Sequence, residues 1–141
     1  MRPLLLASYF ALSACMHTAG ADGTAGDPGQ SAMGEQALLT HSVFFELTND
    51  DPEAIAALVE GCYKYLAPHD GIVYFSAGAR HTEYKREVND LDFDVALTIV
   101  FESTAAQDAY QVTKPHQQFI DTFNENWASV RVFDSFAPAA R

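Results

Sequence analysis

The chain of 141 residues has the length of one domain, because single domains most often contain about 100–150 residues. Its composition, 48% hydrophobic and 19% charged, is ordinary for a soluble globular protein with one core. Eight Lys and Arg against nineteen Asp and Glu give a formal net charge of -11, so the chain repels the phosphates of nucleic acids and anionic lipid surfaces. No nucleic acid is therefore expected as a partner.

The N-terminus has the features of an export signal. Arg2 precedes an apolar run over residues 4–14, which is too short to span a bilayer. The run ends in Leu12-Ser13-Ala14-Cys15, which resembles a bacterial lipobox. We therefore predict a signal peptide at 1–14, lipidation of Cys15, and a membrane-anchored lipoprotein of the bacterial cell envelope that touches the membrane only through this anchor. The alternative is an ordinary signal cleaved after residues 19–21, which would make the protein periplasmic or secreted.

Residues 15–37 are predicted to form a flexible tether, because they are rich in Gly, Ala, Ser, Thr and Asp and hold too little apolar material for a core. The folded domain is expected over residues 38–138. Within it, Cys62 has no partner at disulfide or zinc spacing. It falls on the apolar stripe of a predicted helix, where a thiol acts as a small hydrophobe.

The domain is expected to begin with a strand at residues 40–48, where His41, Val43 and Phe45 alternate on one face. A helix follows from about Asp51, with a capping carboxylate and Pro52 in its first turn. Its apolar stripe comprises Ile55, Leu58, Val59, Cys62 and Leu66.

Two further strands are predicted at residues 72–78 and 93–102, the second of which alternates from Phe93 to Phe101. The segment 80–92 between them is polar and long for a hairpin loop, and is interpreted as a solvated lid or a loop that contacts a second copy.

Ser103 is expected to cap a short helix over 104–112. Pro115 then restarts helical structure, with Phe119, Phe123 and Trp127 on its apolar stripe. A last strand is predicted at residues 130–136.

The order β-α-β-β-α-β predicts an α+β, ferredoxin-like fold with a four-stranded antiparallel sheet and both helices on one face. Several strands carry apolar side chains on both faces, so the face without helices needs a cover. A homodimer that pairs two sheets into an α+β barrel supplies that cover most simply.

Several short motifs agree with one known family. His41 stands at the head of the first strand, and Gly78-Ala79-Arg80 forms a Gly-Arg type turn after the second. The third strand reads Phe93-Asp94-Val95-Ala96-Leu97 and ends in Phe101-Glu102-Ser103. Tyr110 is followed by Pro115-His116 and Phe119, and the last strand contains Val132-Phe133-Asp134.

Together these motifs resemble the stress-responsive A/B barrel (Dabb) family over about residues 39–137. The family implies a dimeric α+β barrel, and most members have no assigned reaction. A plant member is a polyketide cyclase whose catalytic Tyr and His match Tyr110 and His116, and another pocket His matches His41. A further pocket His falls on Val95, and the family's His-Pro-x-His reads Thr113-Lys114-Pro115-His116 here, so this chain departs from the pattern twice.

His116 is the first candidate for chemistry, because a predicted helix N-terminus disfavours imidazolium and leaves a neutral base. Tyr110 is the candidate acid, reaching the same cavity across a helix break. In the structural interpretation, which we favour, His116 bonds a backbone carbonyl and ties two helices together. His41 is read first as a satisfied core residue, and Asp134 as a carboxylate that orients a histidine.

Three functions follow. The first is a binding module for a small hydrophobic or aromatic molecule, in a pocket whose expected wall comprises His41, Phe45, Tyr74, Val95, Phe119, Phe123 and Trp127. The second is a cofactor-independent cyclase, lyase or isomerase that uses His116 and Tyr110 as an acid/base pair. The third is a structural or interaction protein with no pocket. No cofactor or metal is expected, since the chain has no Gly-rich phosphate loop and His81-x-Glu83 supplies too few ligands.

Overall fold

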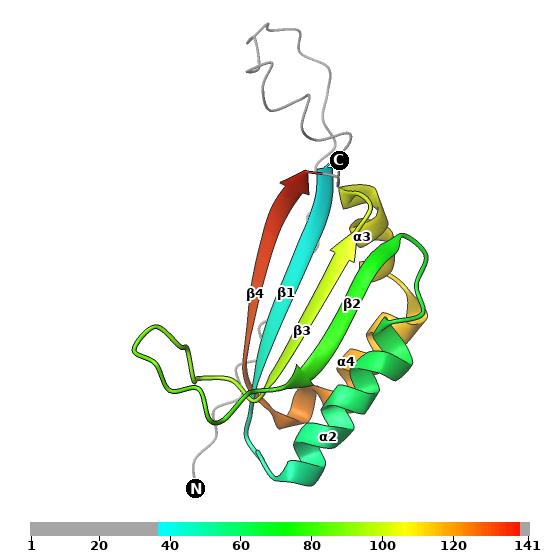
Figure 1. The fold of residues 1–141 in the computed structure, drawn as a ribbon. Helices are drawn as coiled ribbons and strands as arrows, with labels where there is room; N and C mark the ends of the chain where they lie inside the picture. Colours follow the sequence, from blue (N-terminus) through cyan, green and yellow to red (C-terminus); the bar gives the residue numbers. More distant parts are fainter. Residues whose placement is uncertain (1–36, 139–141) are drawn as a thin grey trace, which may run out of the picture.

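A computed structural model describes residues 37–138. The predicted signal peptide and nearly all of the tether, with Cys15, lie outside these residues. The predicted element order is confirmed (Figure 1). The elements are β1 (Ala37–Leu47), α2 (Pro52–Gly61) with a π-helical turn (Cys62–Leu66), β2 (Ile72–Ala79), β3 (Val95–Phe101), α3 (Thr104–Gln111), α4 (Lys114–Phe123) with a 3-10 turn (Asn124–Asn126), and β4 (Trp127–Pro138).

The four strands form one antiparallel sheet in the order β2-β3-β1-β4. All the helices lie behind one face of this sheet in Figure 1, and the opposite face is open. In β1, one of the two central strands, His41 lies opposite Ile99 of β3 on one side and Asp134 of β4 on the other. This register decides which side chains meet beneath the helices.

The core lies between the sheet and the helices. Alternate residues of β1 and β3 point to the helices and are buried, as a period-two apolar pattern requires. The largest fully buried side chains are Phe101, Leu58, Leu66, Leu97, Ile99, Val95 and Cys62. Cys62 is packed as a small hydrophobe, and burial raises the pKa of its thiol to about 12.

Of the two predicted helix caps, the one at Ser103 is present, and Thr113 supplies a further cap that was not predicted. The Ser103 hydroxyl accepts from the Ala106 backbone N–H at 3.1 Å, and the Thr113 hydroxyl accepts from His116 N–H at 3.4 Å. The capping carboxylate predicted for the first helix is wrong, because the Asp51 side chain makes no cap bond. Its backbone N–H instead donates to the Asn49 side chain at 3.1 Å.

Two aromatic residues depart from their predicted elements. Trp127 does not continue the helical stripe, because α4 ends at Phe123 and a 3-10 turn leads into β4, which Trp127 begins. Phe93 precedes β3 and lies against Phe44 of the open face, with ring centroids 5.1 Å apart. Phe93 therefore does not share the buried face of Val95.

Candidate functional site

A cavity of about 190 Å³ lies between the sheet and the helices, on the β1–β4 side. Its walls come from three strands, β1, β3 and β4, from the turn after α2, and from the helices α3 and α4. The lining residues are His41, Val43, Phe45, Leu66, Leu97, Tyr110, Gln111, His116, Phe119, Ile120, Trp127, Val130 and Val132. A mostly apolar wall with a few polar groups is the usual make-up of a small-molecule site.

His41 is buried in this wall and paired with Asp134. The two residues lie opposite each other on β1 and β4, and His41 Nδ1 is 2.6 Å from Asp134 Oδ1. An ionised carboxylate only accepts hydrogen bonds, so it places the imidazole proton on Nδ1. Nε2 is then the nitrogen that can accept a proton from a bound molecule.

Tyr110 stands at the end of α3 and lies against His116 of α4, with ring centroids 4.7 Å apart in a T-shaped arrangement. The chain turns between the two helices at Val112–Thr113, where the Tyr110 carbonyl accepts from both the backbone N–H and the hydroxyl of Thr113. Burial raises the pKa of the Tyr110 phenol above its usual range, and the nearby Cys62 adds to this rise. Tyr110 therefore keeps its proton at neutral pH.

His116 has the opposite shift. Burial lowers the pKa of its imidazole, the backbone of Gln111 opposes this in part, and His41 and His69 add to the lowering. Its Nδ1 is buried and has no hydrogen-bond partner among residues 37–138. Nδ1 therefore makes no carbonyl bond, whereas the backbone of Gln111 at the end of α3 acts on the ring, so the interpretation of His116 as a tie between two helices stays a prediction. At neutral pH the lowered pKa of His116 leaves an uncharged imidazole beside the protonated phenol of Tyr110.

The apolar end of the cavity is aromatic. Phe45, Phe119 and Trp127 contact one another, with ring centroids 5.3 Å apart for Phe45–Trp127, 6.1 Å for Phe45–Phe119 and 5.9 Å for Phe119–Trp127. Trp127 joins this group from β4 and not, as expected, from the helix.

Three of the predicted wall residues lie elsewhere. Tyr74 is 55% exposed and points from the open face, because an irregularity between Ile72 and Tyr74 shifts the alternation of β2. Val95 is fully buried in the core without lining the cavity. Phe123 lies behind Phe119, at 5.2 Å between ring centroids.

The sequence also left some contributors unnamed. Val130 and Val132 reach the cavity because β4 pairs with β1 in register with Phe45 and Val43. His69 lies against the other side of Tyr110, with ring centroids 5.0 Å apart, and its Nε2 is 3.0 Å from the Tyr65 carbonyl. The alternation of β4 hints at the valines, whereas nothing in the local sequence marks His69.

A metal site and a membrane-spanning helix are both absent from the described part of the chain. Residues 37–138 contain no group of three or more His, Cys, Asp or Glu that could hold a metal ion. None of the helices among these residues is long and apolar enough to cross a membrane.

The fold and the site define a ferredoxin-like α+β domain with a histidine-bearing cavity between its sheet and its helices. The chain belongs to the Stress responsive A/B Barrel Domain (Dabb) family, whose sequence profile matches residues 39–137. No curated protein matches the sequence.

Solved structures share the fold. A Dabb family protein from Mesorhizobium loti is 18% identical, with 74% of this chain and 100% of that chain covered and a TM-score of 0.59. A dimeric ferredoxin-like protein of unknown function from Thermobifida fusca is 15% identical, with 73% and 93% covered and a TM-score of 0.59. The hydroxynitrile lyase from Passiflora edulis is 14% identical, with 76% and 98% covered and a TM-score of 0.60. At these identities the likeness shows the fold alone.

Proposed function

We propose that this domain binds a small hydrophobic or aromatic molecule in the cavity between sheet and helices. The cavity itself carries the proposal: its wall is mostly apolar, and its polar groups, His41, Tyr110 and His116, are able to orient a ligand. Its volume of about 190 Å³ is below the roughly 300–1,000 Å³ of pockets for drug-sized ligands, so the ligand is small. The alternative, a structural or interaction protein, predicts instead that no ligand binds at this place.

Intrinsic fluorescence tests the proposal, because Trp127 is the only Trp of the chain and lines the cavity. Titration with a panel of alkylphenols and aromatic aldehydes is expected to change its emission in a saturable way. Val132→Phe fills the cavity from β4 and is expected to abolish the change. Val112→Phe is the control, since Val112 is 79% exposed and outside the cavity. Equal binding by the Val132→Phe protein would place the ligand elsewhere.

A second candidate function is cofactor-independent acid/base catalysis, as a cyclase, lyase or isomerase. It is favoured by the contact between His116 and Tyr110 and by the opposite directions in which burial moves their pKa values. His116 would take a proton from carbon or oxygen, and Tyr110 would donate one to the developing anion or leaving group.

This chemistry is tested by proton exchange in D2O, followed by NMR, at the carbon next to the carbonyl of small aryl ketones. A cyanohydrin is the second probe, because one fold relative is named a hydroxynitrile lyase. His116→Gln and Tyr110→Phe are each expected to lower any observed rate by about 10²-fold or more. A rate that both variants retain would exclude this pair as the catalytic groups.

The proposed location is the bacterial cell envelope, with Cys15 lipidated and residues 15–37 as the tether. The lipobox-like end of the signal supports this proposal. When the full chain is expressed in a bacterium with radiolabelled palmitate, Cys15→Ala is expected to remove the label and Cys62→Ser to retain it. Release of an unlabelled chain beginning after residue 21 would favour the ordinary signal peptide.

The proposed assembly is a homodimer through the open face of the sheet. Solved relatives are described as dimeric, and this face carries Phe133 at 56% exposure and Tyr74 at 55%. Sizing with light scattering is expected to give twice the monomer mass at micromolar concentration. A monomer mass would overturn the dimer.

A further inference from the structure

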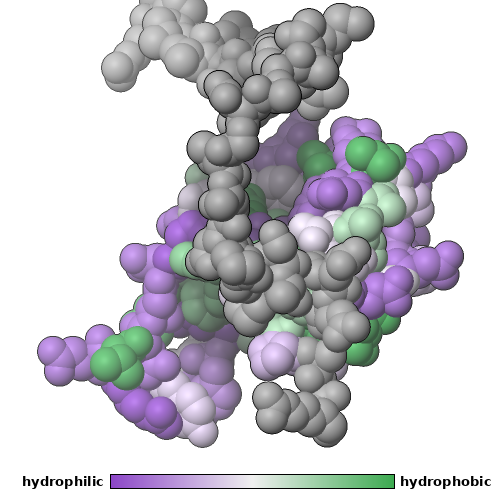
Figure 2. Space-filling model, turned by 90° about the horizontal axis from the view of Figure 1, so that it is seen from above, coloured by the Kyte–Doolittle hydropathy of each residue, from purple (hydrophilic) through white to green (hydrophobic). Residues whose placement is uncertain are grey.

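The segment 80–94 between β2 and β3 forms an arm that stands away from the domain. In Figure 1 it leaves the lower end of the sheet and extends past β4. In Figure 2 it is the lobe at the lower left, mostly hydrophilic with one strongly hydrophobic patch. In Figure 1 the arm lies on the β4 side of the sheet, away from the helices.

The base of the arm is fixed to the sheet at both ends. The Arg80 backbone N–H donates to the Asp94 carbonyl at 2.7 Å, and Arg80 Nε donates to the Phe93 carbonyl at 2.6 Å. The Asp94 N–H donates to the Phe45 carbonyl at 2.8 Å, and the Asp94 carboxylate accepts from Leu47 N–H at 2.8 Å. These bonds tie both ends of the arm to the sheet.

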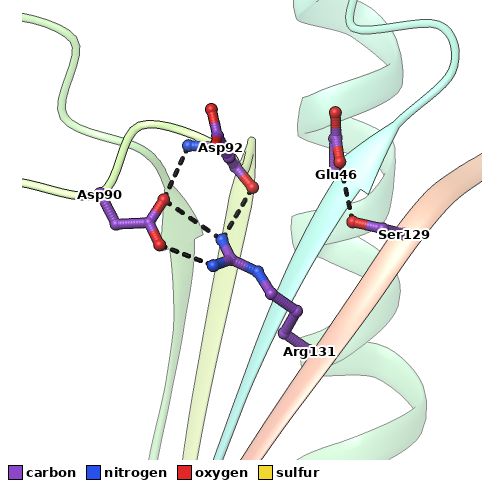
Figure 3. A network of polar contacts seen from close by, with 5 residues as sticks. All are labelled: Glu46, Asp90, Asp92, Ser129 and Arg131. Carbon is purple, nitrogen blue, oxygen red and sulfur yellow. Dashed lines mark hydrogen bonds and ion pairs between the residues drawn. The ribbon is translucent and has the colours of Figure 1, made fainter.

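A second attachment holds the arm to β4. The Arg131 guanidinium, on the open face, reaches both oxygens of the Asp90 carboxylate at 2.6 and 3.3 Å and the Asp92 carbonyl at 2.8 Å (Figure 3). This ion pair holds the pKa of the Asp90 carboxyl below its usual value. A bidentate pair fixes direction as well as distance, so Arg131 sets the angle at which the arm leaves the sheet.

The fixed arm presents apolar side chains to solvent. Val88 is 89% exposed, and Leu91 and Tyr84 are also exposed. The Tyr84 ring stacks on His81 at 4.1 Å between centroids, which gives this part of the arm a defined shape. Exposure of an apolar side chain such as Val88 to water does not stabilise the monomer, although the segment that carries it is held in place.

The arm and the open face form one continuous surface. A hollow of about 280 Å³ between them is lined by Phe44, Asp90, Arg131 and Phe133. Phe44 contacts both Phe93 at the base of the arm and Phe133 of β4, with ring centroids 5.1 and 5.8 Å apart. A molecule that packs on the open face therefore also contacts the arm, at the edge of that face.

We infer that the arm is a clasp for a second copy of this chain, with Val88 and Leu91 packed against the partner once the two open faces meet. This inference rests on the proposed dimer, for which solved relatives described as dimeric and the uncovered sheet face are the support. Because the arm is already held by Arg131 and Asp94, little conformational entropy is lost when it binds.

Sedimentation equilibrium of the full chain with Cys15→Ser tests the clasp. Val88→Glu would bury a charge in the interface, so the dimer Kd is expected to rise about tenfold or more, equivalent to about 1.4 kcal/mol. Val112→Glu is the matched control, because it puts the same charge on another exposed Val, directly after α3 and at 79% exposure, and its Kd is expected to equal that of the parent chain. Arg131→Gln should weaken the dimer as well, by freeing the arm.

The outcomes separate the two proposals. If the parent chain and the Val88→Glu protein dimerise with the same Kd, the arm does not act as a clasp, although the proposed dimer stands. A parent chain that stays monomeric overturns both. Neither substituted valine is buried in the monomer, so both variants are expected to keep the parent circular dichroism spectrum.

Discussion

At the scale of single residues, the cavity has two histidines in different electrostatic settings. His41 is held by the Asp134 carboxylate, whereas His116 has a buried Nδ1 without a partner among the described residues. Burial stabilises the neutral form of the His116 imidazole and lowers its pKa. The carboxylate of Asp134 fixes the orientation of the His41 ring through their hydrogen bond.

The His41–Asp134 pair makes a testable contribution to stability. Asp134→Ala leaves the buried Nδ1–H of His41 without its acceptor, and the expected loss in free energy of unfolding is about 1 kcal/mol, because water reaches the half-exposed Asp134 site and replaces part of the bond. Urea denaturation measures the loss. Asp134→Asn should recover part of it through the amide oxygen, and Ser135→Ala, one residue along β4, should change little. If all three variants were as stable as the parent chain, the His41–Asp134 pair would make no net contribution to the free energy of unfolding.

The lowered pKa of His116 predicts a pH dependence with a definite sign. The unfolded chain takes up this proton near the ordinary value of 6.5, and the folded chain takes it up only at lower pH. The contribution of His116 to stability is therefore complete above that value and is lost as the pH falls towards the folded pKa. Urea denaturation gives the free energy of unfolding at about pH 7.5 and at about pH 5.5. The difference between the two values should be smaller for His116→Gln than for the parent chain. An equal difference would contradict the lowered pKa.

At the scale of elements, the contact between α2 and α4 depends on one glycine. A Cβ built at Gly61 would lie 2.3 and 2.4 Å from two ring atoms of Phe123. Gly61→Ala therefore forces Phe123 to move, and overpacking of about 1–3 kcal/mol is expected to outweigh the roughly 0.5–1 kcal/mol gain in helix propensity.

Thermal unfolding measures this effect, and a double-mutant cycle isolates it. Gly61→Ala should cost less in a Phe123→Ala background, where the ring is absent. Gly78→Ala in β2 is the control, because no atom lies within 4 Å of its added Cβ. A Gly61→Ala protein as stable as the Gly78→Ala protein would show that Phe123 moves aside freely.

The strands show how far sequence reasoning reaches. The alternating apolar residues of β1 and β3 predict both the strands and their buried faces. A shift of one residue in the strand register would expose the whole apolar set to water. The same reasoning misplaces Tyr74, since the irregularity of β2 appears only when the strand pairs with β3. It also misplaces Trp127, four residues after Phe123, where helical spacing continues beyond the end of the helix.

The candidate site is predictable only in part, for a related reason. Tyr110 and His116 are close in sequence and are joined by a helix break, so their contact follows from local structure. His41 and Asp134 are 93 positions apart, and their contact depends on the register of β1 and β4. Alternation gives the face of each residue but not its partner on the next strand.

At the scale of the whole molecule, charge and burial act in opposite directions. The formal charge of -11 keeps the chain soluble and makes two copies repel each other, while the exposed residues of the open face and of the arm favour their association. The proposed dimer thus depends on apolar burial exceeding this repulsion, and added salt weakens only the repulsion.

Salt is therefore expected to strengthen the dimer. Screening shortens the range of repulsion to about 10 Å at 0.1 M ionic strength, so the dimer Kd should fall between about 20 and 150 mM sodium chloride in sedimentation equilibrium. Changing the exposed acids Glu53 and Glu60 of α2 to Gln removes two negative charges per copy and should reduce this dependence. A Kd that rises with salt would mean that ion pairs across the interface, and not apolar contacts, hold the two copies together.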